Sequence, residues 1–277
     1  MNIITSIRFG IRAIILKSAI LLGIWSPRPF VAVLAIGQSN MEGRFGPVDP
    51  AFTDVDERIN VWSLAACRWI PAHLGKEPFY QAKGSRGPAN NLAYVFSQTL
   101  AEDRGAIIRL VLLARGGVPI ETFLPGGDMA PDLLAPRGHA AQALRSLGKS
   151  AYDVLLVHQG EANFTDPDFE PAETYADKLR DLLARLTDAG LVNRKTKIVM
   201  GEISAGYRGS VEHAKALRML SDHCAIARWS GVETVGLRDG TGNQHATGNG
   251  LQLLGERYFR AYERLITQPV WSGKIRR

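Results

Sequence analysis

The chain has 277 residues, of which 45% are apolar and 22% are charged, a composition that excludes a disordered protein and suits one globular domain with a full core. The formal net charge is +6 and the pI is near 9.4. Lysines and arginines are scattered, without a long basic run or a nucleic-acid-binding motif, so we expect a basic solvated surface and no nucleic-acid partner. Cys67 and Cys224 form neither a disulfide framework nor a zinc pattern, and we expect two independent, mostly buried thiols.

Residues 1–29 differ from the rest of the chain. Apolar side chains recur there every three or four positions and basic side chains fall off that stripe, which predicts a basic amphipathic helix. The uninterrupted apolar stretch after Lys17 is about eight residues, too short for a bilayer span of about 20. We expect a signal-like or membrane-proximal extension of a secreted or membrane-associated protein, with residues 1–25 as candidates for contact with a membrane surface. The alternatives are an extension that packs on the single domain formed by residues 30–277, or a mis-assigned start of the chain.

The first strand of that domain is predicted at residues 31–36, where six apolar residues rich in Val and Ile indicate a buried strand of a parallel sheet. Gly37-Gln38-Ser39-Asn40-Met41 follows directly and breaks the strand pattern. Because ligands of open α/β sheets bind at the carboxyl ends of the strands, Ser39 is a candidate nucleophile. The alternative is that Ser39 only caps a following helix.

The next elements are a short hairpin and a helix. Residues 58–63 and 67–70 are expected to pair as a hairpin that lies over the site as an insertion. Residues 90–100 have helical spacing, and residues 107–114 form an apolar strand-like run. Residues 116–138 are rich in Pro and Gly, which predicts a long loop, and loops of such length in compact domains are usually functional.

Strand-like and helical patterns then alternate to the end of the chain. Helices are expected at 139–147, 173–186, 211–229 and 251–259, and strands at 152–157, 197–203 and 232–237. This alternation predicts an α/β fold with a parallel sheet covered by helices on both faces. His213, His223 and Cys224 lie close together in sequence, but their spacing fits no metal motif, and we expect them on a helix surface.

Three more polar clusters each follow a strand-like run. They are Gly116-Gly117 after residues 107–114, His158-Gln159-Gly160-Glu161 after residues 152–157, and His245 after residues 232–237. Four strand ends would therefore supply a serine, a glycine pair, an amide with a carboxylate, and a histidine. A serine hydrolase needs this set of groups, as nucleophile, oxyanion donors and general base.

These blocks resemble the SGNH (GDSL-like) hydrolase superfamily, and within it the group of sialate O-acetylesterases and acetylxylan esterases, carbohydrate esterase family six. The Gly-Gln-Ser-Asn-Met block of that group is matched without change at 37–41, its Gly-Gly block within 115–120, and its His-Gln-Gly-Glu block at 158–161. The resemblance spans roughly residues 31–262. It implies a three-layer α/β sandwich and a serine esterase that removes O-acetyl groups from an acetylated carbohydrate, without a cofactor or a metal.

The resemblance also implies roles for individual residues. Ser39 is the nucleophile and His245 is the general base, because the group places its base just before the last helix; His158 is the rival for this role. The oxyanion donors are the backbone N–H groups of Ser39 and Gly117 together with the Gln159 side-chain amide. The residues expected to support these groups are Gln38, Asn40, Gly116 and Glu161.

One element of the family pattern is missing. The group has an aspartate three residues before the catalytic histidine, and this chain has Gly242 there. We favour Asp239 as the acid that orients His245, with Glu161 and Asn243 as rivals; a Ser–His dyad without an acid is a further alternative. The same departure supports a second hypothesis, a non-catalytic or weakly active carbohydrate-binding relative of the same fold.

Overall fold

The structure of the protein is a computed structural model that describes residues 30–43, 46–48, 55–79, 87–165, 169–229, 234–235 and 245–267. The extension at residues 1–29 and its expected membrane contact lie outside the described residues. No helix in the described part of the chain is long and apolar enough to cross a membrane.

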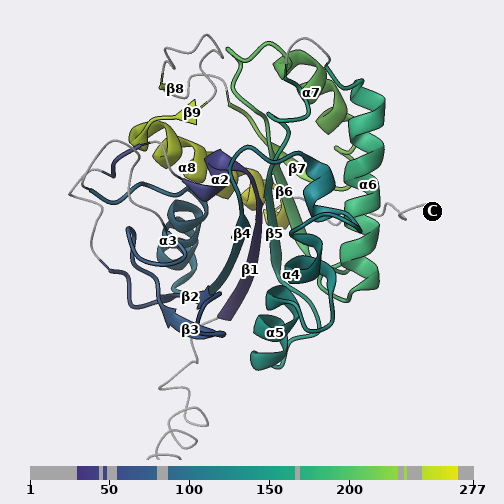
Figure 1. Ribbon diagram of the computed structural model, residues 1–277. Coiled ribbons are helices and arrows are strands. Elements are labelled where there is room, and N and C mark those ends of the chain that lie inside the picture. Colours follow the sequence, from purple (N-terminus) through teal and green to yellow (C-terminus); the bar gives the residue numbers. More distant parts are fainter. Residues whose placement is uncertain are drawn as a thin grey trace, which may run out of the picture.

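A mixed seven-stranded sheet forms the centre of the fold (Figure 1). Its strands are β1 (Phe30–Gly37), β2 (Ile59–Ser63), β3 (Arg68–Pro71), β4 (Ile107–Ala114), β5 (Val154–His158), β6 (Lys197–Gly201) and β7 (Ala225–Ala227). They are arranged in the order β3-β2-β4-β1-β5-β6-β7, and every neighbouring pair except β2 and β3 is parallel. The central position of β1 places its carboxyl end between those of β4 and β5.

Helices cover both faces of this sheet (Figure 1). On one face lie α3 (Leu92–Arg104) and α8 (Gly248–Thr267), which pack against each other. On the other face lie α4 (Ala130–Leu134), α5 (His139–Ser146), α6 (Ala172–Asp188) and α7 (Ser210–Arg218). The predicted α/β fold with helices on both faces is confirmed.

The alternation of side chains along β1 explains why its sequence is apolar throughout. Leu34 and Ile36 belong to the core under α4 to α7, whereas Val33 and Ala35 belong to the core under α3 and α8. Successive side chains of a strand point to opposite faces, so a central strand covered on both sides needs apolar residues at every position.

The predicted hairpin is present, but its place differs from the expectation. Strands β2 and β3 pair antiparallel, with Trp62 opposite Trp69. Strand β2 also pairs in parallel with β4, so the hairpin forms the edge of the main sheet and is not an insertion over the site. Because β2 lies within the main sheet, most of its residues are buried. The short apolar pattern at residues 58–63 does not reveal this pairing.

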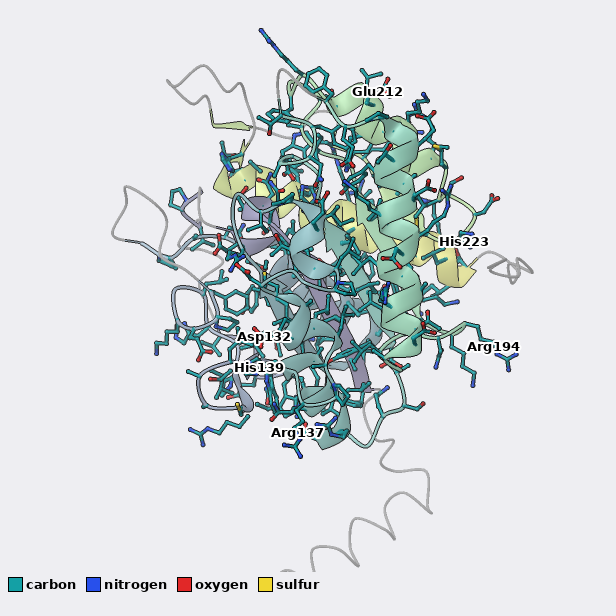
Figure 2. The ribbon with its side chains drawn as sticks, turned by 45° about the vertical axis from the view of Figure 1, so that its right-hand side comes forward. Asp132, Arg137, His139, Arg194, Glu212 and His223 are labelled. Atoms are coloured by element: carbon teal, nitrogen blue, oxygen red, sulfur yellow. The ribbon has the colours of Figure 1, made fainter. Side chains whose placement is uncertain are left out.

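The segment at 116–138 is more structured than a long loop. It contains a short 3₁₀ helix, η2 (Ile120–Phe123), and the whole of α4. Figure 2 shows Asp132 of α4 beside His139 at the start of α5, with His139 Nε2 3.8 Å from Asp132 Oδ1. The many Gly and Pro residues connect short helical turns here and do not leave the segment irregular.

The prediction of one helix over 211–229 is also wrong in its length, because α7 ends at Arg218 and the edge strand β7 follows. His213 is fully buried, so the expected surface location fails for this residue. Cys224 is buried, as expected for the thiol, but it does not lie on a helix surface. The expectation of a buried thiol fails for Cys67, which lies exposed in the turn between β2 and β3.

Candidate active site

The candidate nucleophile lies where β1 ends between two neighbours. Gly37 pairs with Ala114 of β4 on one side and His158 of β5 on the other. A Cβ atom at Gly37 would lie 2.1 Å from the His158 carbonyl oxygen, so only glycine allows this approach. The chain then turns directly into the short helix α2 (Ser39–Glu42), whose first residue, Ser39, is 4% exposed.

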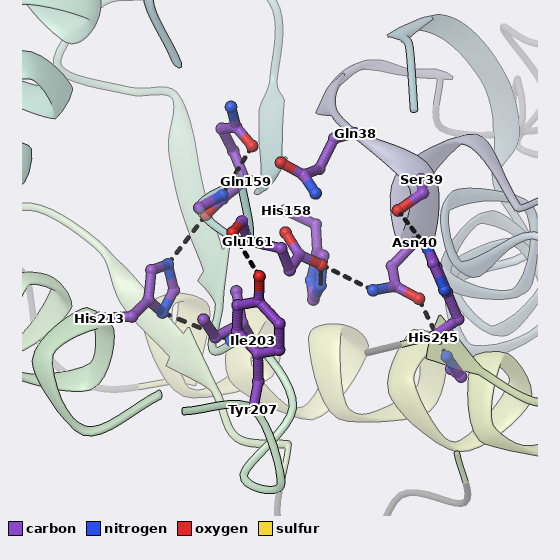
Figure 3. A network of polar contacts seen from close by, with 12 residues as sticks. Gln38, Ser39, Asn40, His158, Gln159, Glu161, Ile203, Tyr207, His213 and His245 are labelled. Carbon is purple, nitrogen blue, oxygen red and sulfur yellow. Dashed lines mark hydrogen bonds and ion pairs between the residues drawn. The ribbon is translucent and has the colours of Figure 1, made fainter. Parts of the chain in front are cut away.

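The candidate base reaches Ser39 from the far end of the sequence. His245 and Ala246 form the two-residue strand β9, which pairs antiparallel with β8 (Thr234–Val235). His245 Nε2 lies 3.0 Å from Ser39 Oγ, a hydrogen bond that joins residues 206 positions apart (Figure 3). Of the two candidate histidines, the structure therefore places His245 against the serine. His158 does not contact Ser39 in this way and lies in a buried network with Glu161 and Tyr258.

Asn40 connects the strand of His245 to the end of β5 (Figure 3). Its Nδ2 donates to Glu161 Oε1 at 2.7 Å, and its Oδ1 accepts the Ala246 N–H at 3.0 Å. Because a carboxylate accepts and a backbone N–H donates, these two partners define the orientation of the amide. Asn40, which follows the candidate nucleophile, thus holds Ala246, which follows the candidate base.

Glu161 and His158 form a buried polar network behind this bridge. His158 Nε2 lies 3.5 Å from Glu161 Oε1, and both side chains are fully buried. Tyr258 OH donates to the Val157 carbonyl at 2.7 Å and therefore accepts from His158 Nδ1 at 2.9 Å. Burial alone would raise the pKa of Glu161, but its contacts with His158 and Asn40 outweigh burial and hold this pKa below the usual value. Glu161 contacts β9 through Asn40.

The candidate oxyanion loop follows β4. The Gly116 N–H donates to Glu42 Oε2 at 3.1 Å, and a Cβ atom at Gly116 would lie 3.5 Å from Ser39 Cβ. Gly117 has a φ of +74° and is exposed, and this left-handed conformation favours glycine. The structure therefore brings both glycines to the edge of the sheet that carries the serine.

Gln159 is held by several contacts. Its Nε2 donates to the Val118 carbonyl at 2.9 Å and its Oε1 accepts the Gly160 N–H at 2.6 Å. Its backbone carbonyl accepts two further hydrogen bonds, from Tyr175 OH at 2.8 Å and from His213 Nε2 at 2.9 Å. The amide is thus oriented by the loop after β4 and by its own loop.

Gln38 supports the same loop. Its Oε1 accepts the Ala162 N–H at 3.2 Å, which ties the residue before the serine to the turn after Glu161. All four predicted supporting residues, Gln38, Asn40, Gly116 and Glu161, lie in or beside the site.

His213 and Glu42 were not predicted as site residues. His213 Nδ1 accepts the Ile203 N–H at 3.4 Å, so Nε2 carries the proton that is donated to Gln159. Burial lowers the pKa of His213 to about 4. Nothing in the sequence around a histidine on a short helix indicates such a contact, because its partner lies 54 positions away. His213 is a neutral imidazole that holds the Gln159 loop.

We expect the stabilising effect of His213 to weaken as the pH falls from about 6.5 towards 4. In this window the unfolded chain binds a proton at this histidine and the folded protein does not, so protonation favours unfolding. Urea denaturation measures the free energy of unfolding of the wild type and of His213→Asn. The wild type should exceed the variant by more at about pH 7.5 than at about pH 5. A difference independent of pH would contradict the buried neutral imidazole.

Several predicted site positions have no structural description. Asp239, Gly242 and Asn243 lie outside the described residues, so the acid that orients His245 stays a prediction. Among the described residues, no group of three or more His, Cys, Asp or Glu side chains could hold a metal ion.

A mostly parallel sheet with a serine and a histidine in contact at its carboxyl edge is the arrangement of an SGNH-like esterase. The sequence profile of the family described as "Carbohydrate esterase, sialic acid-specific acetylesterase" matches residues 30–264. This span covers most of the chain, and the chain belongs to this carbohydrate esterase family. The membership supports carbohydrate acetylesterase activity. No curated protein sequence matches the chain.

Solved structures share the fold at low sequence identity. A protein from Arabidopsis thaliana superposes with a TM-score of 0.63 over 86% of this chain and 98% of that chain, at 21% identity. NanS gives a TM-score of 0.62 over 87% of this chain and 99% of that chain, at 14% identity. A carbohydrate acetylesterase from Xanthomonas citri gives 0.53 over 84% of this chain and 56% of that chain, at 18% identity. These similarities establish the common fold.

Proposed function

We propose that the protein is a serine esterase that removes O-acetyl groups from a carbohydrate through an acetyl-enzyme on Ser39. The observation that carries this proposal is the 3.0 Å contact between Ser39 Oγ and His245 Nε2. A serine hydroxyl is a weak nucleophile until a base removes its proton, and imidazole titrates near neutral pH. The family of the chain supports an acetylated carbohydrate as the substrate.

In the first half of the reaction, Ser39 Oγ attacks the carbonyl carbon of the acetyl ester while His245 Nε2 takes the hydroxyl proton. The carbonyl oxygen becomes an oxyanion, which accepts hydrogen bonds from the backbone N–H groups of Ser39 and Gly117. Gly117 is preferred over Gly116 because the Gly116 N–H is bound to Glu42. The imidazolium then returns the proton to the sugar oxygen, and the C–O bond to the sugar breaks.

In the second half, water attacks the acetyl group on Ser39 and His245 takes a proton from this water. A second oxyanion forms in the same place, and its collapse releases acetate and returns the proton to Ser39 Oγ. The Gln159 amide is the third proposed donor, through the N–H that does not bind Val118. Both halves use the same donors, so one preorganised loop serves acylation and deacylation.

Asp239 remains the acid that we propose to orient the His245 imidazole. A carboxylate there would hold the ring in the tautomer with Nδ1 protonated and stabilise its charged form. The contacts of Glu161 with His158 and Asn40 support an indirect role for this rival, because it reaches the histidine strand through Asn40.

Acetate release from a panel of acetylated carbohydrates tests the proposal. O-acetylated sialic acid and acetylated xylan are the first substrates, and Ser39→Ala is the matched inactive protein. The proposal predicts release by the wild type that the variant lacks. A wild type that binds these glycans without releasing acetate would support the second candidate, a carbohydrate-binding relative without turnover.

Replacing Gln159 with alanine should lower kcat by roughly 10²–10³-fold with little change in KM, because the amide would act on charge that develops only in the transition state. Steady-state kinetics on a soluble acetyl ester measures both constants. A change confined to KM would instead assign Gln159 to binding the sugar.

Gln142→Ala is the matched control for this variant. Gln142 Nε2 donates to the Arg137 carbonyl at 2.6 Å, so it also holds a loop carbonyl through its amide, but in α5 away from Ser39. We expect this substitution to leave kcat and KM unchanged.

A further inference from the structure

A buried carboxylate lies on the same short helix as the proposed nucleophile. Glu42 is the last residue of α2, three positions after Ser39, and it is 2% exposed. Burying a carboxylate is unfavourable unless hydrogen bonds compensate for lost hydration. One such bond is the 3.1 Å contact in which Glu42 Oε2 accepts the Gly116 N–H.

The loop that receives this bond is held at three successive points. The Arg115 N–H donates to the Gly37 carbonyl at 3.1 Å, which continues the pairing of β4 with β1. The Gly116 N–H is bound by Glu42, and the Val118 carbonyl is bound by Gln159 Nε2 at 2.9 Å. Gly117 lies between two anchored peptide groups and is exposed, with a φ of +74°.

Gly116 also packs tightly between the carboxylate and the serine. A Cβ atom built on it would lie 2.9 Å from Glu42 Oε2 and 3.5 Å from Ser39 Cβ. The loop thus approaches α2 closely, and the carboxylate and the nucleophile belong to one helical turn.

From this geometry we propose that Glu42 is a positioning residue of the esterase, which fixes the Gly116–Gly117 backbone relative to Ser39. The inference rests on the proposed function, because it assigns Glu42 to the oxyanion donor of that reaction. Glu42 withdraws the Gly116 N–H from solvent and leaves the next N–H, that of Gly117, facing the oxyanion. We assign Glu42 no direct role on the substrate or the reacting atoms.

This role has a kinetic consequence. Oxyanion donors act through preorganisation, and a displacement of about 1 Å in a positioned group can cost about 10²-fold in rate. Loss of the Glu42 bond would release the Gly117 peptide without removing it. We therefore expect a fall in kcat and an almost constant KM, since the donor bonds to charge that forms only in the transition state.

Three substitutions of Glu42 separate the bond from the charge. Glu42→Ala removes the acceptor, and we expect kcat to fall roughly 10- to 100-fold with KM within about twofold. Glu42→Asp keeps the charge but withdraws the carboxylate by about 1.5 Å, one C–C bond, and should lower kcat similarly. Glu42→Gln keeps a neutral oxygen acceptor at the same reach and should retain kcat within about fivefold.

Asp153→Ala is the matched control. Asp153 Oδ2 accepts the Ala32 N–H at 2.7 Å, so it is also a carboxylate bound to the backbone, but near the opposite end of β1 from Ser39. This variant is expected to lose stability and to keep the wild-type kcat. It shows what the loss of a carboxylate–backbone bond does to the fold alone.

Hydrogen exchange at the Gly116 amide, followed by NMR, is the readout that does not depend on turnover. We expect faster exchange in Glu42→Ala and Glu42→Asp than in the wild type and Glu42→Gln. If Glu42→Ala or Glu42→Asp is folded and has the wild-type kcat, the positioning role is overturned. The proposed esterase function would stand in that case, because the wild type still releases acetate. If Glu42→Ala does not fold, the kcat and the Gly116 amide exchange of Glu42→Asp test the positioning role. A wild type without esterase activity would overturn the proposed function itself, and the catalytic role of Glu42 with it.

Discussion

Ser39→Ala is expected to abolish acetyl-ester hydrolysis and to leave the protein folded. Loss of the nucleophile in a serine hydrolase costs on the order of 10⁶-fold in kcat. The hydroxyl contacts His245 at the edge of the sheet and is not part of the apolar core, so its removal leaves the core packing intact. Acetate release measures the activity, and thermal denaturation measures the fold.

Ser97→Ala is the control for that substitution. Ser97 is also a buried serine, whose Oγ donates to the Ala93 carbonyl within α3 at 2.7 Å. This variant should keep the wild-type rate. Activity of Ser39→Ala within a few-fold of the wild type would remove Ser39 from the role of nucleophile.

His245→Ala is expected to lower kcat by about 10³-fold or more, the scale of loss for a triad member. Added imidazole should restore part of the activity, because a small base can enter the space left by the ring and accept the Ser39 proton. The measurement is the rate of ester hydrolysis with and without imidazole, at a pH where imidazole is neutral.

His158→Ala gives the comparison that separates a base from a structural histidine. Its ring is fully buried between Glu161 and Tyr258, so we expect loss of stability and no rescue by imidazole. Rescue of His158→Ala, together with an active His245→Ala, would show that the base is His158.

The strands around the site follow from the sequence because their residues carry a local signal. The run at 107–114 predicts β4 with its bounds, since all its residues except Arg109 are apolar, a pattern typical of a strand covered on both faces. The Gly-Gln-Ser-Asn-Met block likewise indicates the turn after β1, where Gly37 must lie against the His158 carbonyl.

Features that depend on distant partners could not be predicted in this way. The hairpin sequence does not reveal that β2 pairs with β4, and the apolar spacing after α7 does not show that a three-residue strand replaces the helix. His213 is buried because it donates to the Gln159 carbonyl, a partner on another element. Glu42 does carry a local signal, because it is an acid three residues after the candidate serine. Its role cannot be predicted from that position, since its partner is the Gly116 N–H in the loop after β4.

The candidate site also has a part that the sequence predicts and a part that only the structure reveals. The sequence predicts that the four polar clusters lie at one edge of the sheet, because parallel strands end at the same edge. The bridge from Glu161 through Asn40 to Ala246 needed the structure, since it fixes side-chain geometry between segments far apart in sequence. The acid behind His245, with Asp239 as the proposed residue, lies outside the described residues.

The central claim, that Ser39 is the residue acylated during turnover, is tested most directly by the site of covalent labelling with an organophosphate ester. Such a compound transfers its phosphoryl group to an activated serine and forms a stable adduct. Inactivation of the wild type should parallel the appearance of a single adduct on the peptide that contains Ser39, and Ser39→Ala should remain unlabelled. Complete inactivation with the adduct on another residue, or complete labelling of Ser39 with activity retained, would contradict the claim.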